Sequence, residues 1–166
     1  MSYKHCFQYT IFEEEINITS KLLKEIKSYS LTKDETNNNN FLKKDKKLLS
    51  MIKKNLQDIF KKHKLNIIDC WIQLYLKNDY HSIHTHFATQ KDYSFVWFID
   101  GDKDSSPLTF YDVGYPLIRT DQILTFKFVP GTFVIFPGYL PHEVYPNKSK
   151  NRLFENFRTN GNKKMF

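Results

Sequence analysis

The sequence predicts an α+β protein that is mainly β, a jelly-roll barrel with two N-terminal helices packed on one sheet. Three observations predict this fold. Up to about residue 65, apolar residues recur with helical spacing. Beyond that point they alternate with polar residues and are mostly β-branched or aromatic, and turn residues divide the chain into short segments. Two helices followed by about eight strands favour a helical layer on one sheet of a barrel.

Two amphipathic helices are predicted in the first part of the chain. The first covers residues 16–29, where apolar positions follow helical spacing and Thr19 or Ser20 can cap the N-terminus. The second covers roughly residues 42–63, where apolar residues again mark one helical face. Residues 34–40 contain no apolar side chain, so we expect an exposed loop between the helices.

Seven later segments have the alternation and composition of β-strands. They are residues 67–76, 93–99, 108–111, 123–129, 132–136, 142–146 and 152–157. Turns rich in Gly, Pro, Asn and Asp separate them. We therefore expect a single domain over residues 1–166, in which a helical lead-in (1–65) precedes a β core (66–160).

Composition and charge argue against several classes of protein. The net charge of +7 lies almost wholly in residues 1–66, which carry 14 lysines and 8 acidic residues. These lysines interrupt an apolar helical stripe, so a solvated helix face is favoured over a nucleic-acid surface. The chain has neither an apolar run long enough for a membrane span nor a signal sequence, which predicts a soluble, cytoplasmic protein. Cys6 and Cys70 form no CxxC pair, so no disulfide or zinc knuckle is expected.

Histidines in the β region form a candidate metal site. His84 and His86 are separated by one residue, and on a strand residues i and i+2 point to the same face. Such a pair alone could equally be two surface histidines. A third histidine, His142, follows an apolar strand and a Pro-Gly turn, which places it on a separate strand. Three imidazoles leave coordination positions open for substrate and dioxygen. His81 is expected to point away, because its offset from His84 is odd.

Arg152 is a candidate anion-binding residue. It follows His142 by ten residues, enough for the chain to turn and return as a neighbouring strand. It also begins a mostly apolar alternating segment, and an arginine inside a barrel needs an anion. Its guanidinium could bind a carboxylate through two parallel hydrogen bonds.

Several of these segments together resemble a known family. They are His84-Thr85-His86, Asp92 to Ile99, Ser106 to Phe110, Gly131 to Pro137, and Pro141 to Asn147 followed by Arg152. The combination resembles the iron(II)- and 2-oxoglutarate-dependent oxygenases, and within them the small prolyl-hydroxylase-like proteins common in bacteria and bacteriophages. The match covers roughly residues 68–160. It implies a double-stranded β-helix (jelly roll, cupin-like) as the core.

The resemblance also implies a cofactor, a reaction and a set of metal ligands. Fe(II), 2-oxoglutarate and dioxygen are expected to support hydroxylation of a C–H bond, with a prolyl or other amino-acid residue as the first expectation for the substrate. His84 and His142 are implied as iron ligands. His86 stands where the family usually has Asp or Glu, so the three histidines are the expected catalytic metal site.

The cosubstrate site is implied in the same way. Arg152 is expected to bind the distal carboxylate of 2-oxoglutarate, while Tyr75 and Ser94 are expected to contact the cosubstrate. The sequence further predicts an apolar pocket that excludes water from the metal. Its expected residues are Trp71, Phe95, Trp97 and Phe133 or their neighbours.

Alternatives remain open at this point. Asp92 could supply a carboxylate ligand if the chain after His86 folds back over the metal. A cupin-type metalloenzyme that does not use 2-oxoglutarate is also compatible, because Gly131, Pro137 and His142 fit the spacing of a second cupin motif. From a different class, the chain could be a non-catalytic basic binding module.

Overall fold

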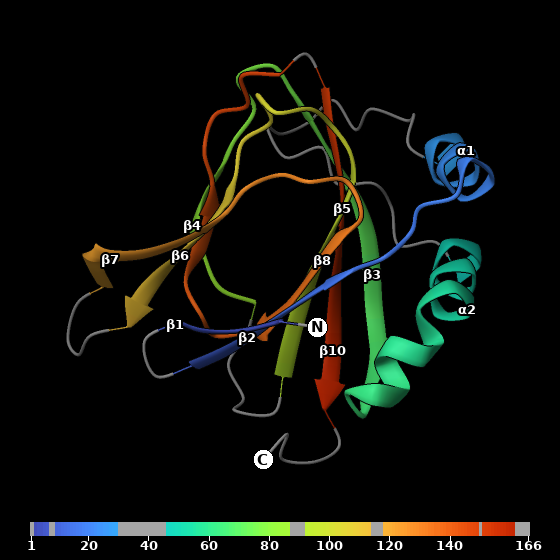
Figure 1. Ribbon diagram of the computed structural model, residues 1–166, viewed down its shortest axis with the longest axis horizontal. Helices are drawn as coiled ribbons and strands as arrows, with labels where there is room; N and C mark the ends of the chain where they lie inside the picture. The colour runs from blue at the N-terminus through green and yellow to red at the C-terminus, as the bar shows by residue number, and fades with distance from the viewer. Residues whose placement is uncertain are drawn as a thin grey trace.

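The computed structural model describes residues 2–6, 9–29, 46–86, 92–113, 118–149 and 151–161, and these form two helices and ten strands. The strands belong to two antiparallel sheets that face each other (Figure 1). Both helices cover the outer side of the larger sheet. The chain is therefore mainly β with two N-terminal helices, as the sequence predicts.

The larger sheet has the strand order β1-β2-β8-β5-β10-β3, and the smaller sheet has the order β4-β9-β6-β7. The strands of the larger sheet are β1 Ser2–Cys6, β2 Tyr9–Glu15, β3 Leu65–Leu76, β5 Asp92–Asp100, β8 Thr132–Pro137 and β10 Asn151–Gly161. Those of the smaller sheet are β4 His81–His84, β6 Leu108–Val113, β7 Ile118–Phe126 and β9 His142–Val144. The helices are α1 Ser20–Tyr29 and α2 Lys46–Lys62.

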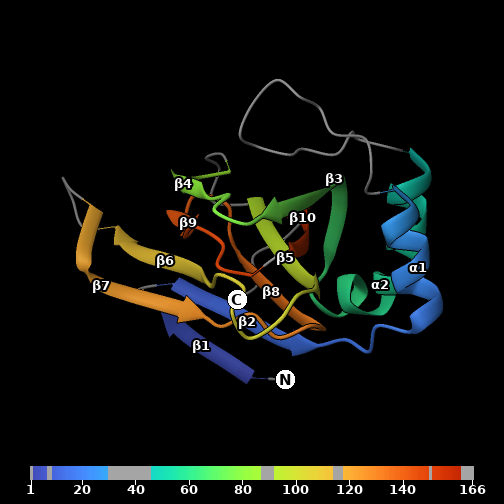
Figure 2. The same ribbon diagram turned by 90° about the horizontal axis from the view of Figure 1, so that it is seen from above.

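The central strand β5 separates two cores. Its side chains alternate between the two faces of the sheet, as in any strand. Phe95, Trp97 and Ile99 pack with the apolar residues of α1 and α2, which lie beside this sheet in Figure 2. Val96 and Phe98 face the smaller sheet instead. Since both faces of β5 are covered, its sequence is a nearly continuous apolar run.

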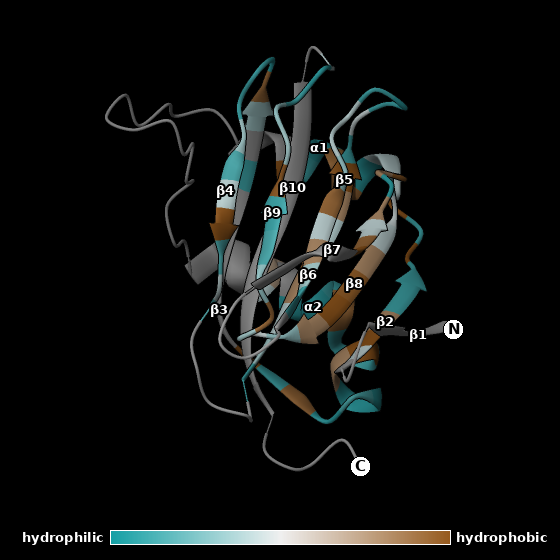
Figure 3. Cartoon of the chain, turned by 90° about the vertical axis from the view of Figure 1, so that its left-hand side faces the viewer, coloured by the Kyte–Doolittle hydropathy of each residue, from teal (hydrophilic) through white to brown (hydrophobic). Residues whose placement is uncertain are grey.

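The core between the sheets determines where a site can form. Val96 and Phe98 meet Leu108 and Phe110 of β6 and Val144 of β9 there. Figure 3 shows apolar residues concentrated on β5 and β8, whereas β4 and β9 are more hydrophilic. Polar residues are thus concentrated on two short neighbouring strands of the smaller sheet.

Each helix is fixed to the sheet by residues that its sequence pattern indicates. The backbone N–H of Leu22 donates to Oγ1 of Thr19 over 3.2 Å, so Thr19 caps α1. In α2 the ring of Phe60 packs against Phe95 with centroids 5.1 Å apart. Leu22 and Ile26 of α1 are buried in the same core cluster as Phe60, so the apolar stripe of each helix faces the larger sheet, as the helical spacing predicts.

A polar contact fastens β2 to the end of α2. The Glu14 carboxylate accepts hydrogen bonds from Nζ of Lys62 over 2.8 Å and from Nε2 of His63 over 3.0 Å. Burial raises the pKa of the Glu14 carboxyl, but these two bonds outweigh it and hold that pKa below its ordinary value. Glu14 is therefore charged at neutral pH and pairs with the helix terminus.

Residues 2–6 and 9–15 correct the prediction of a helical lead-in over 1–65. They form the β1–β2 hairpin, which extends the larger sheet through pairing of β2 with β8. Ile11 is buried in the core between the sheets, while its neighbour Phe12 is buried beneath the helices. Two adjacent apolar residues followed by three glutamates match neither the helical period of 3.6 residues nor the strand period of two, so the sequence did not indicate a strand here.

The other predicted elements are confirmed with changed bounds. The helix predicted over 16–29 begins at Ser20. The strand predicted over 123–129 instead covers Ile118–Phe126, and the one predicted over 142–146 ends at Val144. Strand β4 was not predicted as a separate element. The loop predicted over 34–40 lies outside the described residues. No helix in the described ranges is long and apolar enough to cross a membrane.

Gly131 precedes β8 in a conformation that other residues rarely adopt. Its φ is +94°, and a Cβ atom there would lie 2.8 Å from the carbonyl oxygen of Ile16. We therefore expect Gly131→Ala to lower the free energy of unfolding by about 2 kcal/mol or more. Chemical denaturation measures this change. Val129→Ala in the same turn is the control, since that side chain is 51% exposed and should cost under about 0.5 kcal/mol. Equal effects of the two substitutions would contradict the prediction.

Candidate metal centre

Two of the predicted ligands lie opposite each other on neighbouring strands. In the register of β4 and β9, His84 is paired directly with His142. Directly opposed residues of an antiparallel pair share a face of the sheet. His142 is 2% exposed and packs against Phe110 and Phe136, with ring centroids 5.7 and 4.8 Å away. Both histidines therefore face the core between the two sheets.

The third histidine, His86, is positioned by a backbone hydrogen bond rather than by strand pairing. His86 lies beyond the end of β4, so strand pairing does not orient it. Its backbone N–H donates instead to the carbonyl of Gly138 over 2.6 Å. The Gly138 N–H in turn donates to the carbonyl of Asp92 over 2.8 Å. The turn between β8 and β9, which precedes His142, thus also fixes the position of His86.

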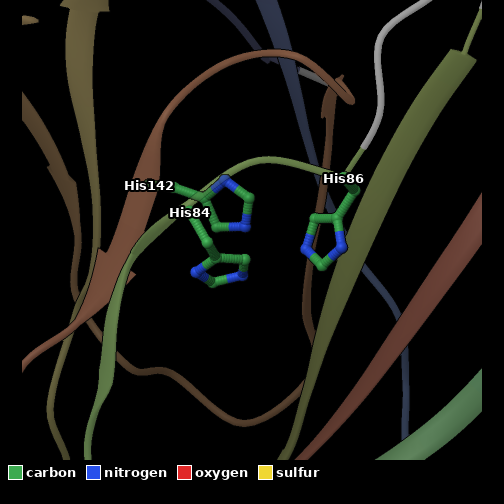
Figure 4. Close-up of side chains that lie close together, drawn as sticks. All are labelled: His84, His86 and His142. Atoms are coloured by element: carbon green, nitrogen blue, oxygen red, sulfur yellow. The ribbon is translucent and has the colours of Figure 1, made fainter.

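The three imidazoles converge, as Figure 4 shows: His84 and His142 lie side by side, and His86 faces them. One ligand atom from each of the three lies within 4.8 Å of the others. Three nitrogens that bind one ion at about 2.1 Å from the same side lie about 3.0 to 3.4 Å apart, so ring movements of about an ångström would complete coordination. The arrangement fits a single divalent metal ion.

Hydrogen bonds to the backbone determine which ring nitrogen His84 and His142 present to the site. Nδ1 of His84 lies 2.8 Å from the Ser82 carbonyl, and Nδ1 of His142 lies 2.8 Å from the Leu140 carbonyl. A ring nitrogen facing a carbonyl must carry the proton, which leaves Nε2 of each ring with its lone pair free for a metal. The same two-residue offset to the carbonyl occurs in both ligands.

Burial keeps these imidazoles in the neutral form. It lowers the pKa of His84 below its ordinary value, although the bond to Ser82 partly opposes this. The pKa of His142 lies well below its ordinary value because of burial first, and then because of the neighbouring His84 and His86. Neutral imidazole is the form that binds a metal, so the lowered pKa values of His84 and His142 favour metal binding.

His81 corrects the expectation that it points to the opposite face. Its ring stacks on that of His84, with centroids 3.7 Å apart and planes 15° from parallel. The register of β4 and β9 shifts between the two residues: His84 pairs with His142, but His81 pairs with Val144. One extra residue on β4 therefore opposes β9, which is a β-bulge. The bulge restores His81 to the face that carries His84.

The predicted apolar pocket is also wrong in its residues. Phe95, Trp97 and Phe133 belong to the core beneath the helices, on the opposite face of the larger sheet from the histidines. The side chain of Trp71 lies outside the described part. A small cavity of about 10 Å³, enough for one water molecule or ion, adjoins the histidines instead. It is lined by Tyr75, His81, His84, His86, Val96, Leu108, His142 and Val144.

Tyr75 and Ser94 are placed on the inner side of the larger sheet. Tyr75 is 2% exposed and lines the cavity, with its hydroxyl 3.4 Å from Nδ1 of His81. Ser94 precedes the cavity residue Val96 by two positions and so shares its face of β5. Its hydroxyl is buried, and within the described structure it has no hydrogen-bond partner.

Arg152 and Asp92 lie at the ends of strands. Arg152 is paired with Tyr75 in the register of β10 and β3, and its side chain lies outside the described part. Asp92 begins β5 and is buried. Among the described residues, the group with metal-ligand geometry consists of the three histidines and does not include Asp92.

Comparisons with known proteins agree with this arrangement at the level of the fold. No family model matches the sequence, and no curated protein matches it. Solved structures do match. An oxidoreductase of the 2OG-Fe(II) oxygenase family from Burkholderia pseudomallei is 15% identical, with 85% of this chain and 78% of that chain covered and a TM-score of 0.62.

Two prolyl hydroxylases also share the fold. The prolyl-4-hydroxylase of Pseudomonas putida is 15% identical over 94% of this chain and 95% of its own, with a TM-score of 0.62. The collagen prolyl hydroxylase of Paramecium bursaria Chlorella virus-1, solved with 2-oxoglutarate, is 15% identical over 95% and 99%, with a TM-score of 0.65. The fold of this chain is thus shared with a 2OG-Fe(II) oxygenase and with two prolyl hydroxylases, which confirms for the fold the resemblance that the sequence indicates.

Proposed function

We propose that this chain is an iron(II)- and 2-oxoglutarate-dependent dioxygenase that hydroxylates a C–H bond. The observation that carries the proposal is the convergence of His84, His86 and His142 inside a fold shared with such enzymes. The two facing sheets would be the halves of a double-stranded β-helix. We further propose one domain over residues 1–166, with the catalytic core in 66–160.

The three histidines are proposed as the metal ligands. Their donor chemistry fits Fe(II), since neutral imidazole suits first-row divalent metals and three ligands leave other coordination positions open. Bound Fe(II), with 2-oxoglutarate and dioxygen, supplies the oxidation that inserts oxygen into a C–H bond and releases succinate and carbon dioxide. The backbone bonds of His84 and His142 hold the rings that would bind the ion.

Three further residues are proposed to bind 2-oxoglutarate. The unpartnered buried hydroxyl of Ser94 is a donor that a carboxylate would satisfy. Tyr75 offers a hydroxyl in the cavity, and Arg152 opposes it on the next strand with a charge that suits the distal carboxylate. The described cavity has the size of an ion, so we expect cosubstrate binding to displace side chains around it.

The proposed substrate class is a prolyl or other amino-acid residue. Two of the structures with this fold are prolyl hydroxylases, which makes a peptide the first class to test. Another was solved with hygromycin B bound, which makes a small molecule the second. Mass spectrometry of a peptide mixture incubated with enzyme, Fe(II) and 2-oxoglutarate would detect the added oxygen atom.

A spectroscopic titration tests the proposed chemistry. Anaerobic protein loaded with Fe(II) is expected to gain a visible charge-transfer band on addition of 2-oxoglutarate, and to form succinate once dioxygen is admitted. Arg152→Gln should weaken 2-oxoglutarate binding by about 100-fold, because it removes a charge-assisted double hydrogen bond. Lys127→Gln is the control, because Lys127 is an exposed cation in the connection between β7 and β8. This variant should leave the band unchanged. Absence of both band and succinate would refute the proposal.

One observation favours a second candidate. The described ligand group contains three histidines and no carboxylate, a set that also suits a cupin-type dioxygenase without a cosubstrate. Such an enzyme would bind Fe(II) through the same residues but would show no band with 2-oxoglutarate. The titration therefore separates the two candidates.

A further inference from the structure

His81 contacts two parts of the candidate site that otherwise lie on different sheets. One face of its ring stacks on His84 of the smaller sheet, with centroids 3.7 Å apart. Its Nδ1 lies 3.4 Å from the hydroxyl of Tyr75, which belongs to β3 of the larger sheet. His81 also lines the cavity that the three histidines and Tyr75 enclose.

The position of His81 depends on the β-bulge in β4. In a regular strand, a residue three positions before His84 would face solvent rather than the cavity. The register shift between the two residues brings His81 opposite Val144, whose side chain also lines the cavity. Bulges commonly re-aim a side chain next to a functional site, and here the re-aimed side chain meets a proposed metal ligand.

We propose that His81 is a positioning residue that couples Tyr75 to the metal ligand His84. The stacked ring restricts rotation of the His84 imidazole, and the bond to Tyr75 holds the hydroxyl that faces the cosubstrate. This inference rests on the proposed function only for the role of Tyr75. The contact with His84 bears on metal binding alone.

Four variants separate the two contacts. His81→Phe keeps an aromatic ring for stacking but cannot bond to Tyr75, whereas His81→Asn keeps a polar group near the position of Nδ1 but has no ring. Tyr75→Phe removes the same hydrogen bond from the other side, and the fourth variant combines it with His81→Phe. Tyr80→Phe is the matched control, because its side chain is 50% exposed and does not line the cavity. Thermal unfolding establishes that each variant is folded.

Binding of Co(II), followed by its visible spectrum, tests the contact with His84 without 2-oxoglutarate. His81→Asn is expected to weaken Co(II) binding about tenfold, as loss of a supporting contact to a metal ligand commonly does. His81→Phe should stay within about threefold of the unmodified protein. Equal Co(II) affinities for His81→Asn, His81→Phe and the unmodified protein would overturn the proposal, whatever the result of the titration with 2-oxoglutarate.

Anaerobic titration of the Fe(II) protein with 2-oxoglutarate tests the contact with Tyr75. His81→Phe and Tyr75→Phe are each expected to raise the dissociation constant about tenfold, and the double variant should raise it no further. Losses that multiply to about a hundredfold would mean that the two residues act independently, and would overturn the coupling. If the unmodified protein binds Co(II) but gives no band, the proposed function fails while the Co(II) comparison still decides the role of His81.

Discussion

The His142→Ala variant is expected to lose metal binding almost completely. His142 is the most buried of the three proposed ligands and is paired directly with His84, so its removal leaves two imidazoles that both come from one short segment of the chain. Loss of a supporting residue alone often costs 10- to 100-fold in metal affinity, so loss of a ligand should cost about 100-fold or more. Titration with Co(II) or Mn(II) measures the affinity. The rise in melting temperature caused by saturating metal should vanish in parallel.

A matched control separates this effect from general destabilisation. His63 is another buried histidine, but it bonds to Glu14 at the far end of α2, away from the cavity. His63→Gln should lower the melting temperature and still bind metal with unchanged affinity. His84→Ala offers a second test at a less buried ligand, in case His142→Ala does not fold. A metal-induced rise in melting temperature in both ligand variants, as large as in the unmodified protein, would rule out the histidine site.

The elements that the sequence predicts are those whose apolar residues recur with a clear helical or strand period. Helix α2 and strands β5 and β8 carry many apolar residues, and burial of those residues decides their structure. Strand β4 lacks such a pattern, since Ile83, its single apolar residue, is 41% exposed. It forms because its backbone pairs with β9, a long-range interaction that local periodicity does not record. Strand β2 was missed because its two adjacent buried residues, Ile11 and Phe12, face opposite sides of the sheet and therefore show no alternation of apolar and polar residues.

The sequence likewise predicts some features of the candidate site and misses others. The residue types are visible in the sequence, and strand pairing places His84 opposite His142. His86 lies beyond the end of β4, and its hydrogen bond to Gly138, which the sequence does not record, places it beside them. His81 could not be placed, because a register shift reverses parity without any glycine or proline to signal it. The apolar lining was misassigned because alternation along β5 separates two faces but does not say which one meets the site. Only the placement of the helices against Phe95 and Trp97 decides that Val96 faces the cavity.

The His86→Asp variant is expected to change the charge of the site, with different effects on the binding of the metal and of 2-oxoglutarate. A carboxylate offsets one positive charge of a divalent ion, whereas the imidazole it replaces is neutral. We therefore expect Co(II) and Fe(II) to stay bound, while the dianion 2-oxoglutarate binds about tenfold more weakly because its electrostatic attraction to the site falls. Isothermal titration with metal, followed by anaerobic titration with 2-oxoglutarate, measures both affinities.

His86→Asn is the control that isolates charge, since it has nearly the shape of Asp without the negative oxygen. The backbone of residue 86 is fixed to the Gly138 carbonyl in either variant, so both side chains start from the same position. Asn is a weak ligand for a transition metal and should lower metal affinity at least about tenfold relative to Asp. Identical metal and 2-oxoglutarate affinities for the two variants would mean that residue 86 does not reach the ion. The site would then rest on His84 and His142, and the missing ligand would have to come from elsewhere in the chain.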